Sequence, residues 1–248
     1  IENINIFAYR ELFITLSTDY MRCFDVDADL IKRLAADLDG PKGFNIASAM
    51  RQMLKQKRDL LTVFDDDGII DRLLEVATKP GRALLSFEIY QVVDRVLDNS
   101  KNEAVQAVVT KHWELTKLED TEENFVVAAA IGVFLKFPPH YIEKLFDDRP
   151  YAPLGISLMR AIGKMTDKEL VELNDQFDLV NRIMDKCNKP DVKANAQIWE
   201  LGDILRNVKE ITSDEWQNFL TEVLEPHIRI RDGNYGGERP HEESSDIV

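Results

Sequence analysis

Apolar residues recur at three- and four-residue spacing along most of the chain, and short polar or proline-containing breaks separate the runs. The stretch 124–147 contains this pattern in full: an apolar run over 126–135 ends at Pro138-Pro139, and a second helical run follows at once. Because proline removes a backbone donor and disfavours the α conformation in the residue before it, the first helix should end near Phe137. The second proline suits the first turn of the next helix. The stretch therefore predicts a helical hairpin.

The same hairpin pattern is repeated along the chain. Besides the hairpin at 124–147, apolar periodicity predicts helices at 6–24, 30–38, 44–57, 68–77, 84–97, 103–115, 154–165, 168–186, 192–208 and 214–224. The first helices of successive pairs begin about 38 to 40 residues apart, with one shorter interval of about 29. No run shows the alternation that a strand requires. The sequence predicts an all-α fold, an α-solenoid of about six antiparallel helical hairpins with a repeat of about 38–40 residues.

Residues 1–226 form the predicted α-helical repeat domain, because helical periodicity fades after Pro226. Residues 227–248 are rich in glycine and acidic side chains, which predicts a flexible acidic tail. Two helix starts have the capping-box spacing, in which a Thr and a Glu three residues later satisfy free amides of the first turn. They are Thr166 with Glu169, and Thr212 with Glu215.

Charge limits the kind of partner. The 248 residues include 45 Asp and Glu against 31 Lys and Arg, a formal net charge of −14. Clustered Lys and Arg are the main grip on nucleic acids, so this balance opposes general binding to phosphate backbones, and no DNA partner is expected. One basic cluster ends the third predicted helix: Arg51, Lys55, Lys57 and Arg58. It either complements the dipole of that helix or docks an anionic partner, an acidic protein surface or RNA.

Cysteine content and hydropathy favour a soluble, intracellular protein. Cys23 and Cys187 lie in helical patterns among apolar neighbours, which favours buried thiols over a disulfide. No apolar run approaches the roughly 18 residues needed to cross a bilayer, so no membrane insertion is expected. The sequence begins at Ile1 rather than Met, and we expect a processed or trimmed chain.

Patterns for catalysis and metal binding are weak. In the segment FDDDGIID, placing Gly68 at the sixth position of a calcium loop puts Val63 first and Leu74 twelfth, and neither supplies an oxygen ligand. The aspartates are expected to cap helices and form solvated turns. The four histidines lack zinc-site spacing, and no GxSxG, P-loop or dinucleotide motif is present. The sequence therefore predicts no metal, no cofactor and no enzyme.

Three hairpins in the second half of the chain share one pattern. They are AAIGVFLKFPPHYIEKL from Ala129, LMRAIGKMTDKELVEL from Leu158 and IWELGDILRNVKEITSDEWQNFL from Ile198. Each has a small residue and an aliphatic pair in its first helix, a short turn, and a second helix with acidic then aliphatic positions. Over about 125–224 this resembles the degenerate helical repeats of organellar RNA-processing proteins of the octotricopeptide and FAST-kinase-like type, and HEAT and armadillo scaffolds resemble it nearly as well. The resemblance implies a mitochondrial or plastid protein, working in RNA metabolism or in a large organellar assembly.

Three hypotheses about function follow. The leading one is a non-catalytic helical-repeat scaffold or adaptor that binds other proteins, as a subunit or assembly factor of a larger, mitochondrial complex. The alternative is an RNA-binding helical-repeat protein of organellar RNA processing or translation, which needs a basic groove. The residues that would form this groove are Arg51, Lys55, Arg58, Lys111, Lys136, Arg160, Lys164 and Arg206. The third is an enzyme, which needs a deep pocket with ionisable groups of shifted pKa. The expected location is the mitochondrial matrix, with the cytoplasm as the alternative.

Overall fold

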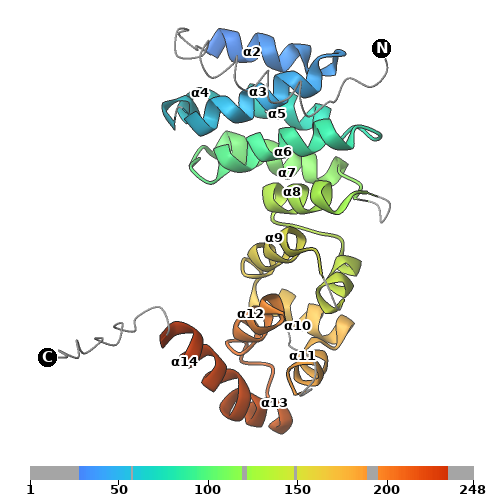
Figure 1. Cartoon of the computed structure of the whole chain (residues 1–248), viewed down its shortest axis with the longest axis vertical. Helices are drawn as coiled ribbons and strands as arrows, with labels where there is room; N and C mark the ends of the chain where they lie inside the picture. Colours follow the sequence, from blue (N-terminus) through green and yellow to red (C-terminus); the bar gives the residue numbers. More distant parts are fainter. Residues whose placement is uncertain (1–27, 57, 119–121, 148–149, 189–194, 234–248) are drawn as a thin grey trace, which may run out of the picture. The chain divides into compact units, whose positions relative to one another are not determined.

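The computed structural model describes residues 28–233 except 57, 119–121, 148–149 and 189–194. Every regular element in these residues is helical and none is a strand, which confirms the predicted all-α fold. The α-helices are α2 (Ala28–Ala36), α3 (Gly43–Gln56), α4 (Leu61–Phe64), α5 (Asp67–Ala77), α6 (Ala83–Leu97), α7 (Glu103–Leu115), α8 (Asn124–Phe134), α9 (Ala152–Ile162), α10 (Asp167–Phe177), α11 (Leu179–Cys187), α12 (Ala196–Leu205), α13 (Asp214–Phe219) and α14 (Glu225–Gly233) (Figure 1). The other elements are the 3-10 helices η1 (Asp37–Asp39), η2 (Arg58–Leu60) and η3 (Pro139–Phe146) and the π-helical turn η4 (Leu220–Leu224).

The helices form two compact units, one that ends at Lys164 and one that begins at Met165. The sequence predicts one repeat domain over 1–226, and the division between the units falls at the short break between α9 and α10. The predicted first helix, 6–24, and Cys23 lie outside the described residues. A solenoid over the whole chain stays a prediction.

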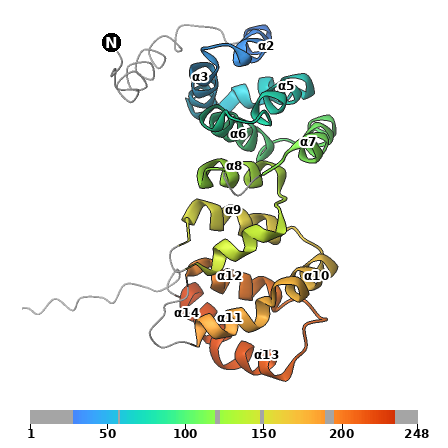
Figure 2. The ribbon, with the colours of Figure 1, turned by 90° about the vertical axis from the view of Figure 1, so that its right-hand side faces the viewer.

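In the first unit, consecutive hairpins stack in two layers (Figures 1 and 2). Helices α3, α6, α8 and α9 pack side by side in one layer, and α2, α5 and α7 do so in the other. Because α5 also packs on α6 and α7 on α8, the two layers share one core. Phe64, Ile69, Leu73 and Ile89 are among the fully buried side chains in it. Burial of such side chains contributes about 1.5 to 3 kcal/mol each, and it is the main force that holds the hairpins together.

Helix α8 is buried on every side. Residues 126–134 are all buried, as expected for a helix that carries no polar stripe. Its small residues, which include Ala128 and Gly132, let α6 and α9 approach closely from both sides. The apolar run that the sequence shows here is therefore a helix buried within the first unit.

The hairpin turn after α8 begins earlier than predicted, and the element after it is a 3-10 helix. The helix stops at Phe134, three residues before the predicted end at Phe137, because Leu135 takes the left-handed conformation with φ of 49°. The Leu135 N–H still donates to the carbonyl of Ile131. The second helix of this hairpin is the 3-10 helix η3, and Pro139 occupies its first turn, as predicted.

The second unit packs α11 against α12 and α13, and α12 against η4. Trp216 is completely buried in its core. Gly202 of α12 allows a close approach: a Cβ atom there would lie 3.3 Å from Cδ1 of Leu224 and 3.6 Å from Cγ2 of Ile183. Gly202 therefore lets α11 and η4 approach α12 closely. Gly132 of α8 has a similar role in the first unit.

One long helix is predicted at 168–186, but the structure has two, α10 and α11. Asp178 lies between them in the left-handed conformation, with φ of 51°, and this backbone ends α10. Asn174 Oδ1 accepts a hydrogen bond from the N–H of Val180 at 3.1 Å. Asn181 Nδ2 donates to Asp178 Oδ1 at 2.7 Å. Local side-chain hydrogen bonds thus stabilise a junction that the apolar spacing does not reveal.

Helical structure continues past the predicted end of the repeat domain. Elements α13, η4 and α14 follow one another directly and pass through Pro226. A proline ring crowds the carbonyl four residues earlier and has no N–H to donate, and the π-helical turn directly before it accommodates both effects. Residues 227–233 of the predicted tail are therefore helical, and residues 234–248 lie outside the described part of the chain.

Helix caps agree with one prediction and correct another. Thr166 and Glu169 form the predicted capping box at α10, with both reciprocal hydrogen bonds present. At α13 the cap is Ser213 rather than Thr212: the Ser213 Oγ accepts from the N–H of Trp216 at 3.3 Å. The cap is one residue later than predicted because Ser213 has the extended backbone that a capping residue needs.

Candidate functional site

The predicted basic patch lies at the carboxyl end of α3 and on η2, but its members have different surroundings. Arg51 Nε donates to Oε2 of Glu88 on α6 at 2.6 Å, and Arg51 Nη2 donates to Oε1 at 3.3 Å. The two side chains are only 11% and 4% exposed. Lys55 and Arg58 are exposed, and Lys57 lies outside the described residues. Arg51 therefore joins two helices, and the structure does not present the four residues as one exposed patch.

Four of the eight residues of the predicted RNA groove form ion pairs with carboxylates of the same chain. The ion pairs are Arg51 with Glu88, Lys111 with Asp71 at 3.0 Å, Arg160 with Asp94 at 2.7 Å and with Asp98, and Arg206 with Asp203 at 2.8 Å. Lys136 and Lys164 are exposed. Arg206 belongs to the second unit and the other seven residues to the first. Four of the eight cations are thus neutralised locally.

Arg160 of α9 reaches across α8 to Asp94 and Asp98 of α6. Gly132 of α8 lies directly beneath this ion pair, since a Cβ atom there would be 3.6 Å from Asp94 Oδ1 and 3.9 Å from Ser157 Oγ. Burial raises the pKa of Asp94, and the nearby Arg160 opposes this effect. The ion pair therefore links α9 to α6, and it packs over the small side of α8 at Gly132.

Asp39, at the end of η1, binds three cations from α5 and from the turn after it. Its carboxylate lies 2.9 Å from Arg72 Nη2, 2.8 Å from Lys79 Nζ and 2.7 Å from Arg82 Nη1. These donors, Lys79 foremost, lower the pKa of Asp39 to about 2. The group is a structural clamp between hairpins, because every charge in it has a partner within the chain.

Asp71 of α5 and His112 of α7 form a pair that the sequence reading did not find. His112 Nε2 lies 2.7 Å from Asp71 Oδ1, and the hydrogen bond lowers the pKa of Asp71. His112 is 3% exposed, and its Nδ1 atom is buried without a hydrogen-bond partner. A carboxylate only accepts hydrogen bonds, so Nε2 of His112 carries the proton in this contact. The two residues are 41 positions apart, about one repeat, which is the signal that could have shown the pair.

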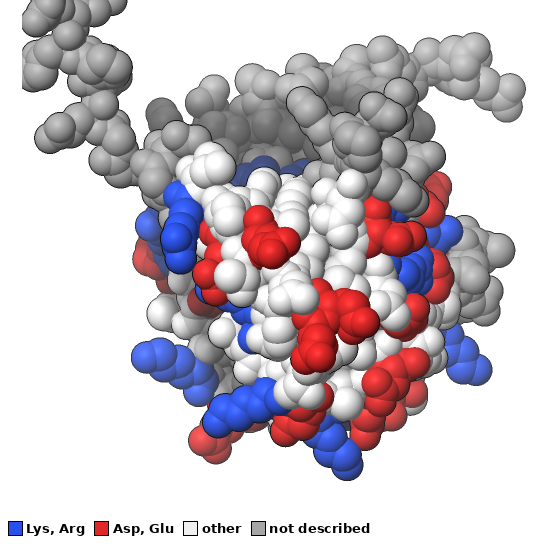
Figure 3. All heavy atoms as spheres, turned by 90° about the horizontal axis from the view of Figure 1, so that it is seen from below, with Lys and Arg blue, Asp and Glu red and all other residues white. Residues whose placement is uncertain are grey.

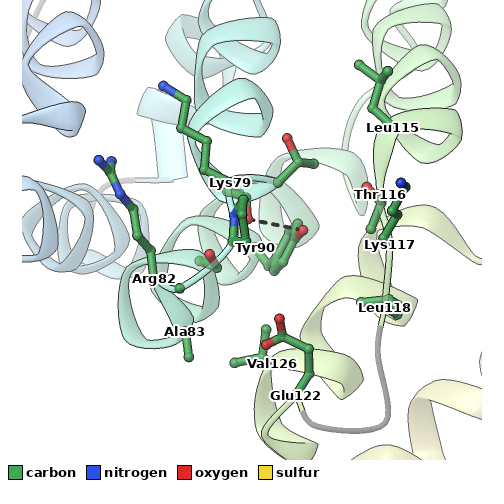
Figure 4. A pocket seen from close by; sticks show the side chains of 15 residues that line it. Lys79, Arg82, Ala83, Tyr90, Leu115, Thr116, Lys117, Leu118, Glu122 and Val126 are labelled. Carbon is green, nitrogen blue, oxygen red and sulfur yellow. Dashed lines mark hydrogen bonds between the residues drawn. The ribbon is translucent and has the colours of Figure 1, made fainter.

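A pocket of about 260 Å³ opens in the first unit between the α5–α6 turn and the end of α7 (Figure 4). Tyr90 and Glu122 point into it, while the charged ends of Lys79 and Arg82 point away. The Tyr90 hydroxyl donates to the carbonyl of Ala77 at 3.5 Å, and burial raises the pKa of Tyr90. The high pKa keeps this phenol neutral, so it acts as a hydrogen-bonding group rather than as a base.

A second and larger cavity, about 650 Å³, lies in the second unit between α10, α11 and the segment that leads into α13. We call it the acidic cleft, and its lining residues are Val171, Asn174, Asp175, Asp178, Val180, Asn181, Met184, Glu210, Ile211, Thr212, Ser213 and Glu215. Four of them are carboxylates and none is Lys or Arg. Figure 3 shows the face that includes α13, where Asp and Glu lie across the middle and Lys and Arg mostly along the edge. The sequence reading missed this cleft because it depends on the junction at Asp178.

The aspartate-rich segment before α5 has a structural role. Asp66 is the N-cap of α5, and its Oδ1 accepts from the N–H of Ile69 at 3.0 Å, which agrees with the predicted capping role. Among the described residues, no group of three or more His, Cys, Asp and Glu side chains is placed to hold a metal ion. Burial raises the pKa of the Cys187 thiol to about 12, so it is not a nucleophile near neutral pH.

Comparisons with known proteins give no relative. No family model matches the sequence, and neither a curated protein nor a solved structure matches it. Within the described part of the chain, none of the helices has the length and apolar character needed to cross a membrane.

Proposed function

We propose that this protein is a non-catalytic helical-repeat scaffold that binds other proteins, as a subunit or assembly factor of a larger complex. One observation carries the proposal. A groove that follows RNA needs Lys and Arg that are free to bind phosphates, whereas Arg51, Lys111, Arg160 and Arg206 form ion pairs with carboxylates of their own chain. A protein partner does not require this positive charge, and the overall excess of acid favours it further.

Helices α6 and α9, and the residue directly before α9, carry large exposed apolar or aromatic side chains. Leu84 of α6 and Ile156 of α9 are both 59% exposed, and Tyr151 directly before α9 is 40% exposed. Large apolar and aromatic side chains are the usual anchors of protein interfaces. These residues therefore support a protein-binding role for the first unit.

The carboxylates that the structure places in contact with cations also fit a scaffold better than an enzyme. A general acid or base works best with a pKa near the working pH. The pKa values of Asp39, Asp66 and Asp71 are instead lowered, so each stays charged and bound to its neighbours. Burial raises the pKa of Asp94, but Arg160 opposes this effect. Such shifts are typical of structural ion pairs.

The mitochondrial part of the proposal rests on the resemblance to organellar helical repeats over about 125–224. The same resemblance supports the alternative, a role in organellar RNA processing or translation. In the first alternative protein contacts hold the assembly together, and in the second RNA does. One measurement distinguishes the two.

The test is the native size of the protein in a lysate of its source, measured by gel filtration before and after ribonuclease treatment. A large species that survives the nuclease is expected, because protein contacts hold it. Collapse to a small species after nuclease treatment would mean that RNA holds the assembly together, and it would favour the RNA-binding alternative. A small species in both runs would contradict both, and imaging of a tagged chain tests the mitochondrial location separately.

A further inference from the structure

The lining of the acidic cleft has an apolar floor, an acidic rim and four neutral polar side chains, those of Asn174, Asn181, Thr212 and Ser213. The floor consists of apolar side chains that are buried or half-buried: Val171, Val180, Met184 and Ile211. The rim consists of exposed carboxylates: Asp175, Asp178, Glu210 and Glu215. A ligand that enters the cleft therefore meets an apolar surface inside a ring of negative charge.

The rim carboxylates have no counter-charge among the described residues. None of the four forms an ion pair with a described Lys, Arg or His, whereas Arg206 and Arg229 in the same unit pair with Asp203 and Glu225. The first unit shows the opposite arrangement, with three cations on the single carboxylate of Asp39. Unpaired like charges around one opening repel one another, and a bound cation relieves this repulsion.

The walls of the cleft are held by hydrogen bonds to the backbone. The amide of Asn174 fixes Val180 at the start of α11, and Gln217 Nε2 donates to the carbonyl of Ile211 at 3.4 Å. The cleft is therefore formed before a ligand arrives, which lowers the entropy cost of binding.

The chemistry of the lining selects the class of ligand. A bare metal ion gains nothing from an apolar floor, and a nucleic acid is repelled by the rim. Lys and Arg side chains combine an aliphatic stem with a charged end, so they fit an apolar floor with an acidic rim. A volume of about 650 Å³ holds a few such side chains rather than a whole domain.

The charge of the whole second unit supports the same class. Residues 165–248 contain 19 Asp and Glu against 10 Lys and Arg, so this third of the chain carries −9 of the net charge of −14. Such a field speeds the approach of a cationic partner and repels an acidic one.

We propose that the acidic cleft docks a basic, amphipathic peptide segment of a partner protein. An apolar side chain of the segment fills the floor beside Met184 and Ile211, and its Lys or Arg side chains pair with Glu210 and Glu215. This inference rests on the proposed function, since it names the partner chemistry and one docking surface of the scaffold.

The test uses a fluorescein-labelled synthetic peptide of leucine and lysine with amphipathic helical spacing, and a leucine and glutamate peptide of the same pattern. Binding to the full chain is measured by fluorescence anisotropy. The double variant Glu210→Gln, Glu215→Gln is expected to bind the lysine peptide roughly tenfold more weakly than the parent, because two charge pairs are lost. The glutamate peptide is expected not to bind.

A matched control changes the same charge elsewhere in the unit. Glu200 and Glu222 are exposed and lie outside the lining of the cleft, so Glu200→Gln, Glu222→Gln should weaken binding by less than about twofold. Equal weakening by both double variants, or no binding of the lysine peptide by the parent chain, would overturn the proposal. Far-UV circular dichroism melts confirm that each variant is folded.

A third variant tests the floor without a change in charge. Met184→Gln places a polar amide among the apolar lining residues, and it should weaken binding of the lysine peptide while leaving its salt dependence unchanged. Unaltered binding would show that the peptide only adheres to the charged surface, and it would overturn the docking site.

The gel filtration experiment separates failure of the cleft from failure of the scaffold. If the large species persists with the variant Glu210→Gln, Glu215→Gln, the scaffold function stands and the docking site is wrong. If no large species forms with the parent chain, the proposed function itself fails. A large species formed by the parent but lost in this double variant, and kept in the control variant, supports both.

Discussion

Asp39 shows how single charges connect neighbouring hairpins. Its carboxylate at the end of η1 accepts hydrogen bonds from Arg72, Lys79 and Arg82, which lie on α5 and the turn that leads into α6. The side chain is 32% exposed, so solvent screens these ion pairs in part. Three cations on one carboxylate nevertheless stabilise the fold more than an ordinary surface ion pair does. The reason is that the positions of the charged groups are fixed by η1, α5 and the turn after α5.

The pH dependence of stability follows from the lowered pKa of Asp39. Its pKa of about 2, against an ordinary value of 3.8 for aspartate, means that the carboxylate stabilises the fold above pH 4 and loses this effect as the pH falls toward 2. Asp39→Asn should lower the free energy of unfolding by about 1 kcal/mol at pH 7, and the difference from the parent should vanish near pH 2. Urea unfolding at both pH values measures it. A constant difference across this range would contradict the role of the charge.

Two substitutions of Gly132 are expected to change the stability of the protein in opposite directions. A Cβ atom at this position meets Asp94 Oδ1 at 3.6 Å, which is ordinary van der Waals contact. Gly132→Ala should therefore be neutral or stabilise the protein by up to about 1 kcal/mol through helix propensity. Gly132→Leu should cost about 1 to 3 kcal/mol, because the larger side chain displaces the ion pair of Arg160 with Asp94. Thermal melts measure the stability of the two variants. If both were as stable as the parent, this side of α8 would face solvent.

At the scale of the element, the start of α13 gives a test in which adjacent residues serve as variant and control. Ser213 caps the helix through Trp216, while Thr212 is exposed and does not cap it. Ser213→Ala should cost about 1 kcal/mol, and Thr212→Ala less than about 0.5 kcal/mol. Urea unfolding followed by tryptophan fluorescence reports the effect. The reverse order would restore the capping box that the sequence predicts.

Much of the element order could be predicted from the sequence because helix-forming runs have local causes. Helix α7 begins at Glu103 and ends at Leu115, as predicted, since Asn102 caps its start and its apolar spacing ends with it. The break at Asp178 was missed because a left-handed backbone leaves no mark on apolar periodicity. The passage through Pro226 was missed because the preceding π-helical turn compensates a residue that ordinarily ends helices.

The candidate sites were harder to predict because their partners are far apart in the sequence. Arg51 and Glu88 are 37 positions apart, so nothing near Arg51 shows that its charge is already satisfied. The acidic cleft combines residues from α10, α11 and the approach to α13, and it needs the junction at Asp178 to bring them together. Sequence pattern thus indicates which helices form, whereas the cleft depends on how irregular backbone joins them.

At the scale of the molecule, the two units differ in how many of their charged side chains form ion pairs between helices. In the first unit, ion pairs such as Arg51 with Glu88 and Arg160 with Asp94 link helices of the same layer, so charge contributes to cohesion. In the second unit, the excess of acid is larger, with a net charge of −9 against −5 in the first, and the rim of the cleft is left uncompensated among the described residues. A cost in stability at one surface is common where that surface serves binding.

This cost can be measured. The double variant Glu210→Gln, Glu215→Gln should raise the free energy of unfolding by a few tenths of a kcal/mol at low ionic strength, because it removes repulsion at the rim. The gain should disappear in about 0.5 M salt, where screening acts over a few ångströms. Urea unfolding followed by fluorescence suits the test, since Trp199 and Trp216 both lie in the second unit. A loss of stability would mean that favourable contacts of these carboxylates within the chain, such as that of Glu215 with the amino end of α13, outweigh the repulsion. A gain together with weaker peptide binding would show that they serve the partner rather than the fold.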